Sequence, residues 1–175
     1  MDTKLFSPRI LVLCGLIAAA AFTRLMPHLP NFTAIGAMAL FGGAYFTNKK
    51  LAFVVPLTAM FLTDLILGYH STIIAVYISF ALIVAIGMMI KKKNVRSIAA
   101  ASLAAAVLFF LITNFAFWTT GVLYPVTGTG LLACYTAGLP FFGYNLVGNL
   151  FYTGVMFGLF ELAKQKYPAL AVIEA

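Results

Sequence analysis

Runs of apolar residues fill this chain, and charged residues, prolines and glycines separate them at short intervals. A helix needs about 20 apolar residues to cross the hydrocarbon core of a membrane. The pattern predicts six helices, at about residues 10–26, 33–47, 51–68, 72–90, 97–120 and 140–164. Backbone polar groups cannot remain unpaired at membrane depth, so each span should be helical. The predicted fold is therefore all-α, a bundle of six transmembrane helices that forms a single transmembrane domain over residues 1–175.

The second predicted span, 33–47, is short and rich in small residues (IGAMALFGGAYF). A span of this length is expected to be tilted, broken or shielded from lipid. Small residues at a spacing of four, such as Ala39 and Gly43 in this span and Gly15 and Ala19 in the first, allow helices to approach closely. Such pairs serve mostly in internal packing, but Gly15 and Ala19 also form a face on which a partner subunit could dock.

The composition excludes an ordinary soluble domain, because 63% of the residues are hydrophobic and only four are acidic. The net charge of +7 does not indicate nucleic-acid binding, since the basic residues stand in short clusters between the apolar runs. All of them except Arg24 fall in connections on one side of the predicted bundle: Lys4, Arg9, Lys49, Lys50, Lys91, Lys92, Lys93, Arg96, Lys164 and Lys166. The positive-inside rule then predicts a multi-pass protein of the bacterial inner membrane with both termini in the cytoplasm. Lys4, Arg9 and the run LVLCGLIAAAAF imitate a signal peptide, but we interpret this segment as the first span.

Motifs of the common enzyme classes do not occur in the sequence. It contains no HExxH, no GxSxG and no glycine-lysine phosphate loop. Cys14 and Cys134 stand without partners at a metal-binding spacing. We therefore expect a protein that is not an enzyme and carries no metal or cofactor of its own. We also expect that it does not hydrolyse ATP through a glycine-lysine phosphate loop.

Two charged residues mark the outer half of the predicted bundle. Asp64 is the only acid inside a span, and an ionisable group at membrane depth is a functional hypothesis by default. Arg24 is the only base on the outer side. The two residues either form a structural pair or bind a ligand, and a pair at the mouth of a cavity can do both.

Asparagines recur in the same outer half, beside aromatic residues. Asn114 and Trp118 are four apart, and so are Asn145 and Asn149, which places each pair on one helix face. The amides and the indole either line a cavity, where they would hydrogen-bond and stack on a planar ligand, or join helices and anchor the protein at the membrane interface.

The outer connections add further candidates. In RLMPHLPNFT the prolines stop the first helix and stiffen the crossing to the second, which would hold Arg24, His28 and Asn31 as donors at a cavity rim. Asn31 could instead cap the second helix. His70 lies in the next outer connection, and both histidines either bind a ligand or are simply solvated.

Four stretches carry a resemblance to a known family: RLMPHLPNFTAIGAMALFGGAYF, LTDLILGYH, TNFAFW and GLLACYTAGLPFFGYNLVGNLFY. Over about residues 22 to 160 the chain resembles an uncharacterised family of bacterial six-helix membrane proteins described as similar to the S components of energy-coupling-factor transporters. The wider resemblance implies capture of a vitamin, or occasionally a metal ion, from the outer face. It also implies docking on a transmembrane coupling subunit driven by two ATPases. Such proteins carry an AxxxA motif on the first helix, where this chain has Gly15-xxx-Ala19 beside Cys14-xxx-Ala18.

We therefore predict a substrate-binding subunit for uptake of a small nutrient, a vitamin-like molecule or a metal complex. Hydrophobic walls with a few polar groups are the usual make-up of such a pocket. In a corrinoid variant of this hypothesis, Cys134, His28 or His70 would ligate the metal. The alternative is a substrate-free membrane assembly protein in which the polar residues only pack helices together.

Overall fold

The computed structural model of the chain describes residues 7–69 and 71–171, so Lys4 and His70 lie outside the described residues. Within these ranges the chain is helical and contains no strand. The elements in order are α1 (Pro8–Phe22), the 3-10 helix η1 (Thr23–Leu25), α2 (Ile35–Tyr45), α3 (Lys49–Leu67), α4 (Ile73–Met88), α5 (Val95–Thr119), α6 (Gly128–Lys166) and the 3-10 helix η2 (Pro168–Leu170). The prediction of an all-α fold with six main helices is confirmed.

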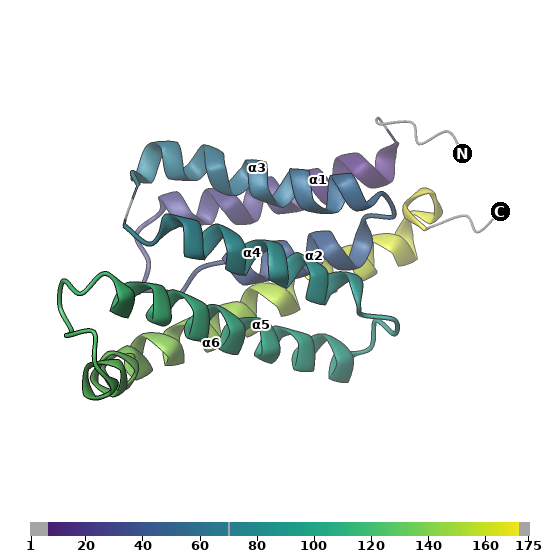
Figure 1. The fold of residues 1–175 in the computed structure, drawn as a ribbon. Helices are drawn as coiled ribbons and strands as arrows, with labels where there is room; N and C mark the ends of the chain where they lie inside the picture. Colours follow the sequence, from purple (N-terminus) through teal and green to yellow (C-terminus); the bar gives the residue numbers. More distant parts are fainter. Residues whose placement is uncertain (1–6, 70, 172–175) are drawn as a thin grey trace.

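Consecutive helices run in opposite directions along the bundle (Figure 1). We call the end at which α1 begins and α6 ends the basic end, and the opposite end the cavity end. Arg9, Lys49 and Lys93 lie at the basic end, at the start of α1, at the start of α3 and in the connection between α4 and α5. Among the described residues Arg24 is the only lysine or arginine near the cavity end. The predicted segregation of basic residues is therefore present in the structure.

Helix length and surface composition identify a membrane-embedded protein. Four segments are long and apolar enough to span a membrane: Pro8–Leu25, Lys49–Leu67, Val95–Thr119 and Gly128–Lys166. The exposed face of α5 carries large apolar residues at every fourth position, namely Leu103, Val107, Leu111 and Phe115. Soluble monomers rarely expose continuous apolar surface of this kind. The two remaining apolar helices, α2 with 11 residues and α4 with 16, are shorter than these four.

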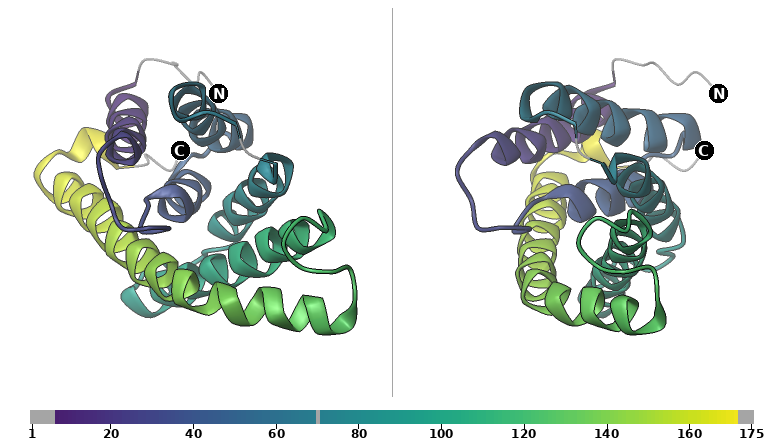
Figure 2. Two further views of the ribbon diagram at one scale, coloured as in Figure 1. Left: turned by 90° about the vertical axis from the view of Figure 1, so that its left-hand side faces the viewer. Right: turned by 60° about the vertical axis from the view of Figure 1, so that its left-hand side comes forward.

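α2 forms the centre of the bundle. Every residue from Ala37 to Gly43 is buried, and α2 contacts each of the other five helices. Figure 2 shows it enclosed by its neighbours. A helix that is apolar on all sides is expected to be buried in this way. Of the alternatives for the second predicted span, shielding from lipid is the one that the structure supports.

Glycines make the close packing around α2 possible. Gly43 of α2 lies against Gly87 of α4, and a Cβ atom on either residue would overlap a backbone carbonyl of the other helix. Gly42 lies equally close to the ring of Pro56 in α3. The Ala39 and Gly43 pair therefore serves internal packing, as predicted.

The predicted start of the last helix at residue 140 is wrong. α6 begins at Gly128, because the side chain of Thr127 caps it by accepting a hydrogen bond from the Gly130 amide at 3.1 Å. Pro140 lies inside the helix, where it removes one backbone hydrogen bond and favours a kink. Figure 2 shows the green first part of α6 running in a different direction from the yellow-green remainder. Cys134, expected in a connection, is consequently helical and buried.

Candidate functional site

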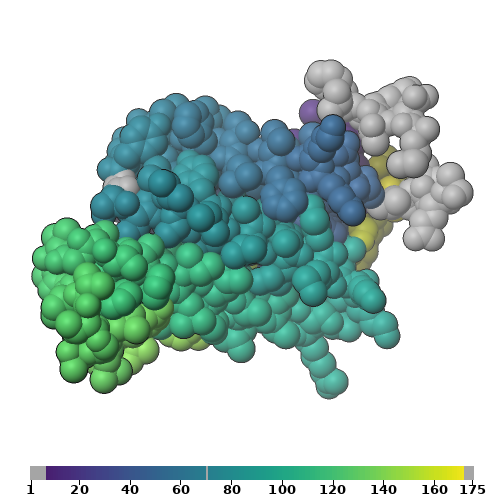
Figure 3. Space-filling model, in the orientation of Figure 1, coloured from purple at the N-terminus to yellow at the C-terminus, as the bar shows by residue number. Residues whose placement is uncertain are grey.

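A cavity of about 320 Å³ opens at the cavity end between the first turns of α2 and α4 and the facing walls of α5 and α6. Its lining combines phenylalanine rings with amides and hydroxyls: Arg24, Asn31, Ile35, Thr72, Val76, Phe109, Phe110, Thr113, Asn114, Phe117, Gly138, Phe141, Phe142 and Asn145. Beside it, the green segment that joins α5 to α6 projects from the bundle (Figure 3). The cavity lining, with apolar walls and a few polar groups, is typical of small-molecule sites.

One face of α5 supplies the first wall. Phe110, Thr113, Asn114 and Phe117 follow the spacing of three and four residues that places side chains on one helix face. Asn114 donates through Nδ2 to the Phe110 carbonyl at 2.8 Å, and the Thr113 hydroxyl donates to the Phe109 carbonyl at 2.7 Å. The Thr113 hydroxyl is therefore engaged as a donor and can still accept a hydrogen bond, whereas the Asn114 amide keeps a second N–H as well as its oxygen.

α6 supplies the opposite wall. Gly138 lets the two helices approach, since a Cβ atom there would overlap Oδ1 of Asn114 and touch the ring of Phe110. Asn145 lies two turns further along, next to the rings of Phe141 and Phe142. Its Oδ1 atom is buried and has no hydrogen-bond partner among the described residues. Leaving a buried amide oxygen unpaired is costly, so Asn145 is an acceptor to which a bound donor would add stability.

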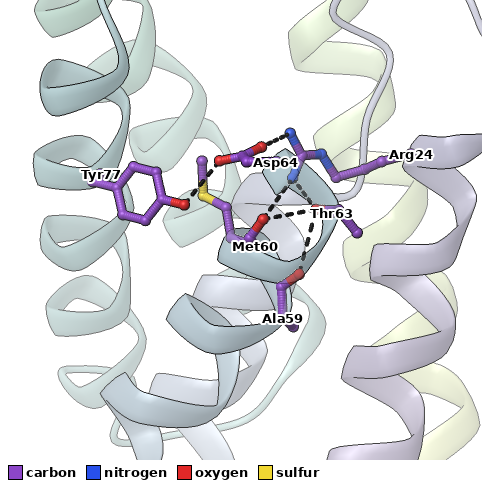
Figure 4. Close-up of polar contacts among 6 residues, drawn as sticks. All are labelled: Arg24, Ala59, Met60, Thr63, Asp64 and Tyr77. Atoms are coloured by element: carbon purple, nitrogen blue, oxygen red, sulfur yellow. Dashed lines mark hydrogen bonds and ion pairs between the residues drawn. The ribbon is translucent and has the colours of Figure 1, made fainter. Parts of the chain in front are cut away.

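Arg24 reaches the cavity from η1 but is already paired (Figure 4). Nη2 contacts Oδ1 of Asp64 at 2.8 Å, and Nη1 donates to the Thr63 hydroxyl and, at 3.5 Å, to the Met60 carbonyl. The Tyr77 hydroxyl donates to the other carboxylate oxygen of Asp64 at 2.9 Å. The side chains of Arg24 and Asp64 are only 9% and 5% exposed. The pair therefore joins α3, α4 and η1, and its two charges balance each other.

Of the remaining predicted site residues, Trp118 and His28 do not line the cavity. Trp118 is partly exposed, and its indole donates to the Pro125 carbonyl at 3.1 Å. His28 is exposed in the connection between α1 and α2, with Nδ1 2.9 Å from the Leu29 carbonyl. Asn31 lines the cavity with a left-handed φ of 60°, and it does not cap α2, whose N-cap is Ala34. His70 lies outside the described residues.

Asn149 packs helices together and does not line the cavity. It is 2% exposed, and Nδ2 donates to the backbone carbonyl and the hydroxyl of Ser102 at 2.7 Å and 3.1 Å. Its Oδ1 faces the backbone of Gly36, where a Cβ atom would overlap it. For this residue the structure supports the helix-joining alternative.

Cys134 belongs to the contact between α5 and α6. Its thiol lies 3.5 Å from the Asn114 carbonyl, as a donor to it. The described residues contain no group of three or more histidines, cysteines or acids that could hold a metal ion. Of the ligands named in the corrinoid variant, Cys134 and His28 do not line the cavity of about 320 Å³, and His70 lies outside the described residues.

The predicted docking pair lies on the outside of α1. Gly15 and Ala19 are both exposed, and a Cβ atom at Gly15 would meet nothing within 4 Å. Their neighbours Cys14 and Ala18 line an apolar groove of about 500 Å³ between α1 and α3. Unlike Gly43 in α2, Gly15 therefore takes no part in the internal packing of the described chain.

Several lining residues were not predicted: five phenylalanines and two threonines lie beside the asparagines, and Tyr77 binds Asp64. A signal for the α5 wall does exist in the sequence, because Phe110, Thr113 and Phe117 share a helix face with Asn114. No comparable signal marks Thr72 or Tyr77, which reach the site only through the packing of α4.

Comparison with known proteins places the chain in one family. The model of DUF6580, described as a family of unknown function, matches residues 4–170. No curated protein and no solved structure matches the sequence.

Proposed function

The chain belongs to the family of unknown function DUF6580, and we propose that it is the substrate-binding subunit of a membrane uptake system. The substrate is a small, flat and uncharged nutrient, a vitamin-like molecule, that binds in the cavity between α5 and α6. The protein performs no chemistry on it.

The walls of the cavity indicate the size and shape of the ligand. A cavity of about 320 Å³ lies at the lower limit of the volumes that ligand sites usually have. Phenylalanines line both of its long walls, with Phe110 and Phe117 on α5 facing Phe141 and Phe142 on α6. Aromatic rings stack well on flat, unsaturated rings. A single planar heterocycle fits this space better than an extended chain.

The pairing of Arg24 with Asp64 indicates the charge of the ligand. Among the described residues, Arg24 is the only charged one in the lining, and its contact with Asp64 neutralises it. An anionic ligand would have to compete with that carboxylate for the guanidinium. The remaining polar lining residues are asparagines and threonines, which carry no charge. A neutral polar ligand therefore suits the cavity better than the anion that Arg24 alone suggests.

The observation that carries the proposal is that Asn145 lines the cavity with an unpaired Oδ1. Asn149 also has a buried, unpaired Oδ1 among the described residues, but it does not line the cavity. The Asn145 acceptor lies beside the aromatic wall, and a ligand N–H or O–H group would satisfy it. A ring that carries an amide or amine and stacks against the phenylalanines would meet both requirements together.

The proposal also includes the orientation of the protein in the membrane and its partner subunit. The basic end faces the cytoplasm of a bacterial cell, which places both termini inside, all six helices in the inner membrane and the cavity at the outer face. The resemblance to S components implies that energy would come from a separate transmembrane coupling subunit with two ATPases. The exposed Gly15 and Ala19 on α1 provide a smooth surface for that subunit, as small residues do at helix contacts.

The test is native mass spectrometry of the protein purified in mild detergent from its own host. We expect the wild type to retain a defined molecule other than lipid, and Asn145→Ala to retain at least about ten-fold less, because one buried hydrogen bond is lost. Asn149→Ala is the matched control. It should keep the ligand but unfold more easily, since Asn149 binds Ser102 and does not line the cavity.

The alternative, a substrate-free assembly protein, predicts a different result. In that case the wild type and both variants would carry only lipid, and both substitutions would affect stability alone. That outcome would remove the uptake proposal and leave the asparagines with a packing role.

A further inference from the structure

The basic end contains a cluster of cations around one aromatic ring. The ring of Tyr45, the last residue of α2, has the Lys93 ammonium 5.4 Å, the Lys164 ammonium 5.9 Å and the Arg9 guanidinium 6.0 Å from its centre. The Tyr45 hydroxyl donates to Glu161 at 2.5 Å. Residues from α1, α2, α6 and the connection between α4 and α5 thus meet at one place.

The charges in this cluster do not balance. Lys164 pairs with both carboxylate oxygens of Glu161, at 3.0 Å and 2.8 Å. Arg9 donates to the backbone carbonyls of Leu170 and, at 2.9 Å, of Tyr45, neither of which carries a formal charge. Three cations and one carboxylate among the described residues leave an excess of two positive charges.

Lys93 is the unsatisfied member of the cluster. It is exposed in the connection between α4 and α5 and has no hydrogen-bond or ion-pair partner among the described residues, so all three of its N–H donors are available. Partial burial of its ammonium group against the neighbouring residues, together with repulsion by Lys164 and Arg9, lowers the pKa of Lys93, and the attraction of Glu161 offsets this only in part. An anion placed among the three cations would relieve that repulsion.

We propose that Arg9, Lys93 and Lys164 form a binding site for a phosphate-bearing anion. A phosphate group supplies one or two negative charges and several acceptor oxygens, which match the excess charge and the free donors of the cluster. Two sources have this chemistry, the headgroup of an anionic membrane lipid and free phosphate. The site lies at the opposite end of the bundle from the cavity and does not depend on the proposed nutrient.

The experiment is a titration of the purified protein in neutral detergent with phosphatidylglycerol, followed by native mass spectrometry. Lys93→Gln should weaken binding about five-fold, because one cation near an anionic headgroup is worth that much. Lys91→Gln is the matched control. Lys91 lies in the same connection, is equally exposed and has no partner among the described residues, but it is not at the Tyr45 ring, so its variant should bind like the wild type.

Competition identifies the source of the anion. If added inorganic phosphate leaves phosphatidylglycerol bound, the site is for the lipid; if it displaces the lipid in the wild type, the site takes the free anion. Phosphatidylcholine, whose headgroup has no net charge, should bind less and show no dependence on Lys93.

Two outcomes would overturn the proposal. Equal losses in Lys93→Gln and Lys91→Gln would mean diffuse attraction to a basic surface and no built site. Binding that appears only after Asp2→Asn and Glu174→Gln, two acids outside the described residues, would mean that the chain supplies its own counter-charge.

Discussion

Arg24 lines the cavity and at the same time pairs with Asp64, which joins parts of the fold. Each end of the pair is tied to further groups, Thr63 and the Met60 carbonyl on one side and Tyr77 on the other (Figure 4). Removing one partner leaves the other as an uncompensated buried charge, which is far more costly than removing both.

We therefore expect Asp64→Asn to lower the free energy of unfolding by about 3 kcal/mol. The double variant Arg24→Met, Asp64→Leu should lose less, because no charge remains buried. Unfolding by sodium dodecyl sulfate in mixed micelles measures both. A double variant that is less stable than Asp64→Asn would contradict this account and indicate that the pair itself is a net source of stability.

The sequence identified the polar site residues better than their roles. Arg24, Asn31, Asn114 and Asn145 do line the cavity, because polar side chains at membrane depth are rare and a face of a helix is readable from spacing. Asn149 has the same residue type and lies on the same helix as Asn145. Its different role depends on the position of Ser102, which only the packing of α5 against α6 determines.

At the scale of the helices, α2 and α4 make a close contact in which glycines from both helices meet. Gly43 and Gly87 bring two backbones together so tightly that an added methyl group would overlap a carbonyl oxygen. A flexible side chain could move away from such an overlap, but a backbone in the middle of two helices cannot move without shifting the whole contact.

Gly43→Ala and Gly87→Ala should therefore each destabilise the protein by about 2 kcal/mol, as overpacking in a dense core does. Gly154→Ala is the control, because Gly154 is exposed on α6 and a Cβ atom there would meet nothing within 4 Å. Thermal unfolding in detergent compares the three. A similar loss at Gly154 would show that the cost comes from the helix backbone and not from the contact.

The helices themselves were predictable to different degrees. The sequence predicts long helices such as α5 because apolar residues fill most of each run. It marks α2 as unusual because its apolar run is short. The start of α6 was missed because a proline and several glycines are typical of a connection, whereas a capped helix can accommodate a single proline. An apolar helix this short is expected to be shielded, but its contact with all five other helices is a tertiary property that no local pattern contains.

At the scale of the whole molecule, the two ends differ in charge. The basic end collects nearly all positive charge of the described chain, and the opposite end holds a neutral cavity with aromatic walls. A capture subunit needs this asymmetry, because basic residues hold one end at the cytoplasmic face while the other end meets the substrate. With the basic end in the cytoplasm, the cavity faces outward, as the proposed function requires.

Cysteine labelling in intact cells tests that direction. In a background with Cys14→Ala and Cys134→Ser, the variant Val122→Cys places a thiol in the exposed connection at the cavity end, and Lys92→Cys places one at the basic end. A maleimide that cannot cross the membrane should label Val122→Cys in intact cells and label Lys92→Cys only after the cells are opened. Labelling of both variants in opened cells controls for expression and folding. The reverse pattern would place the cavity in the cytoplasm, where a subunit for nutrient uptake has nothing to capture, and would favour a different function for the same site.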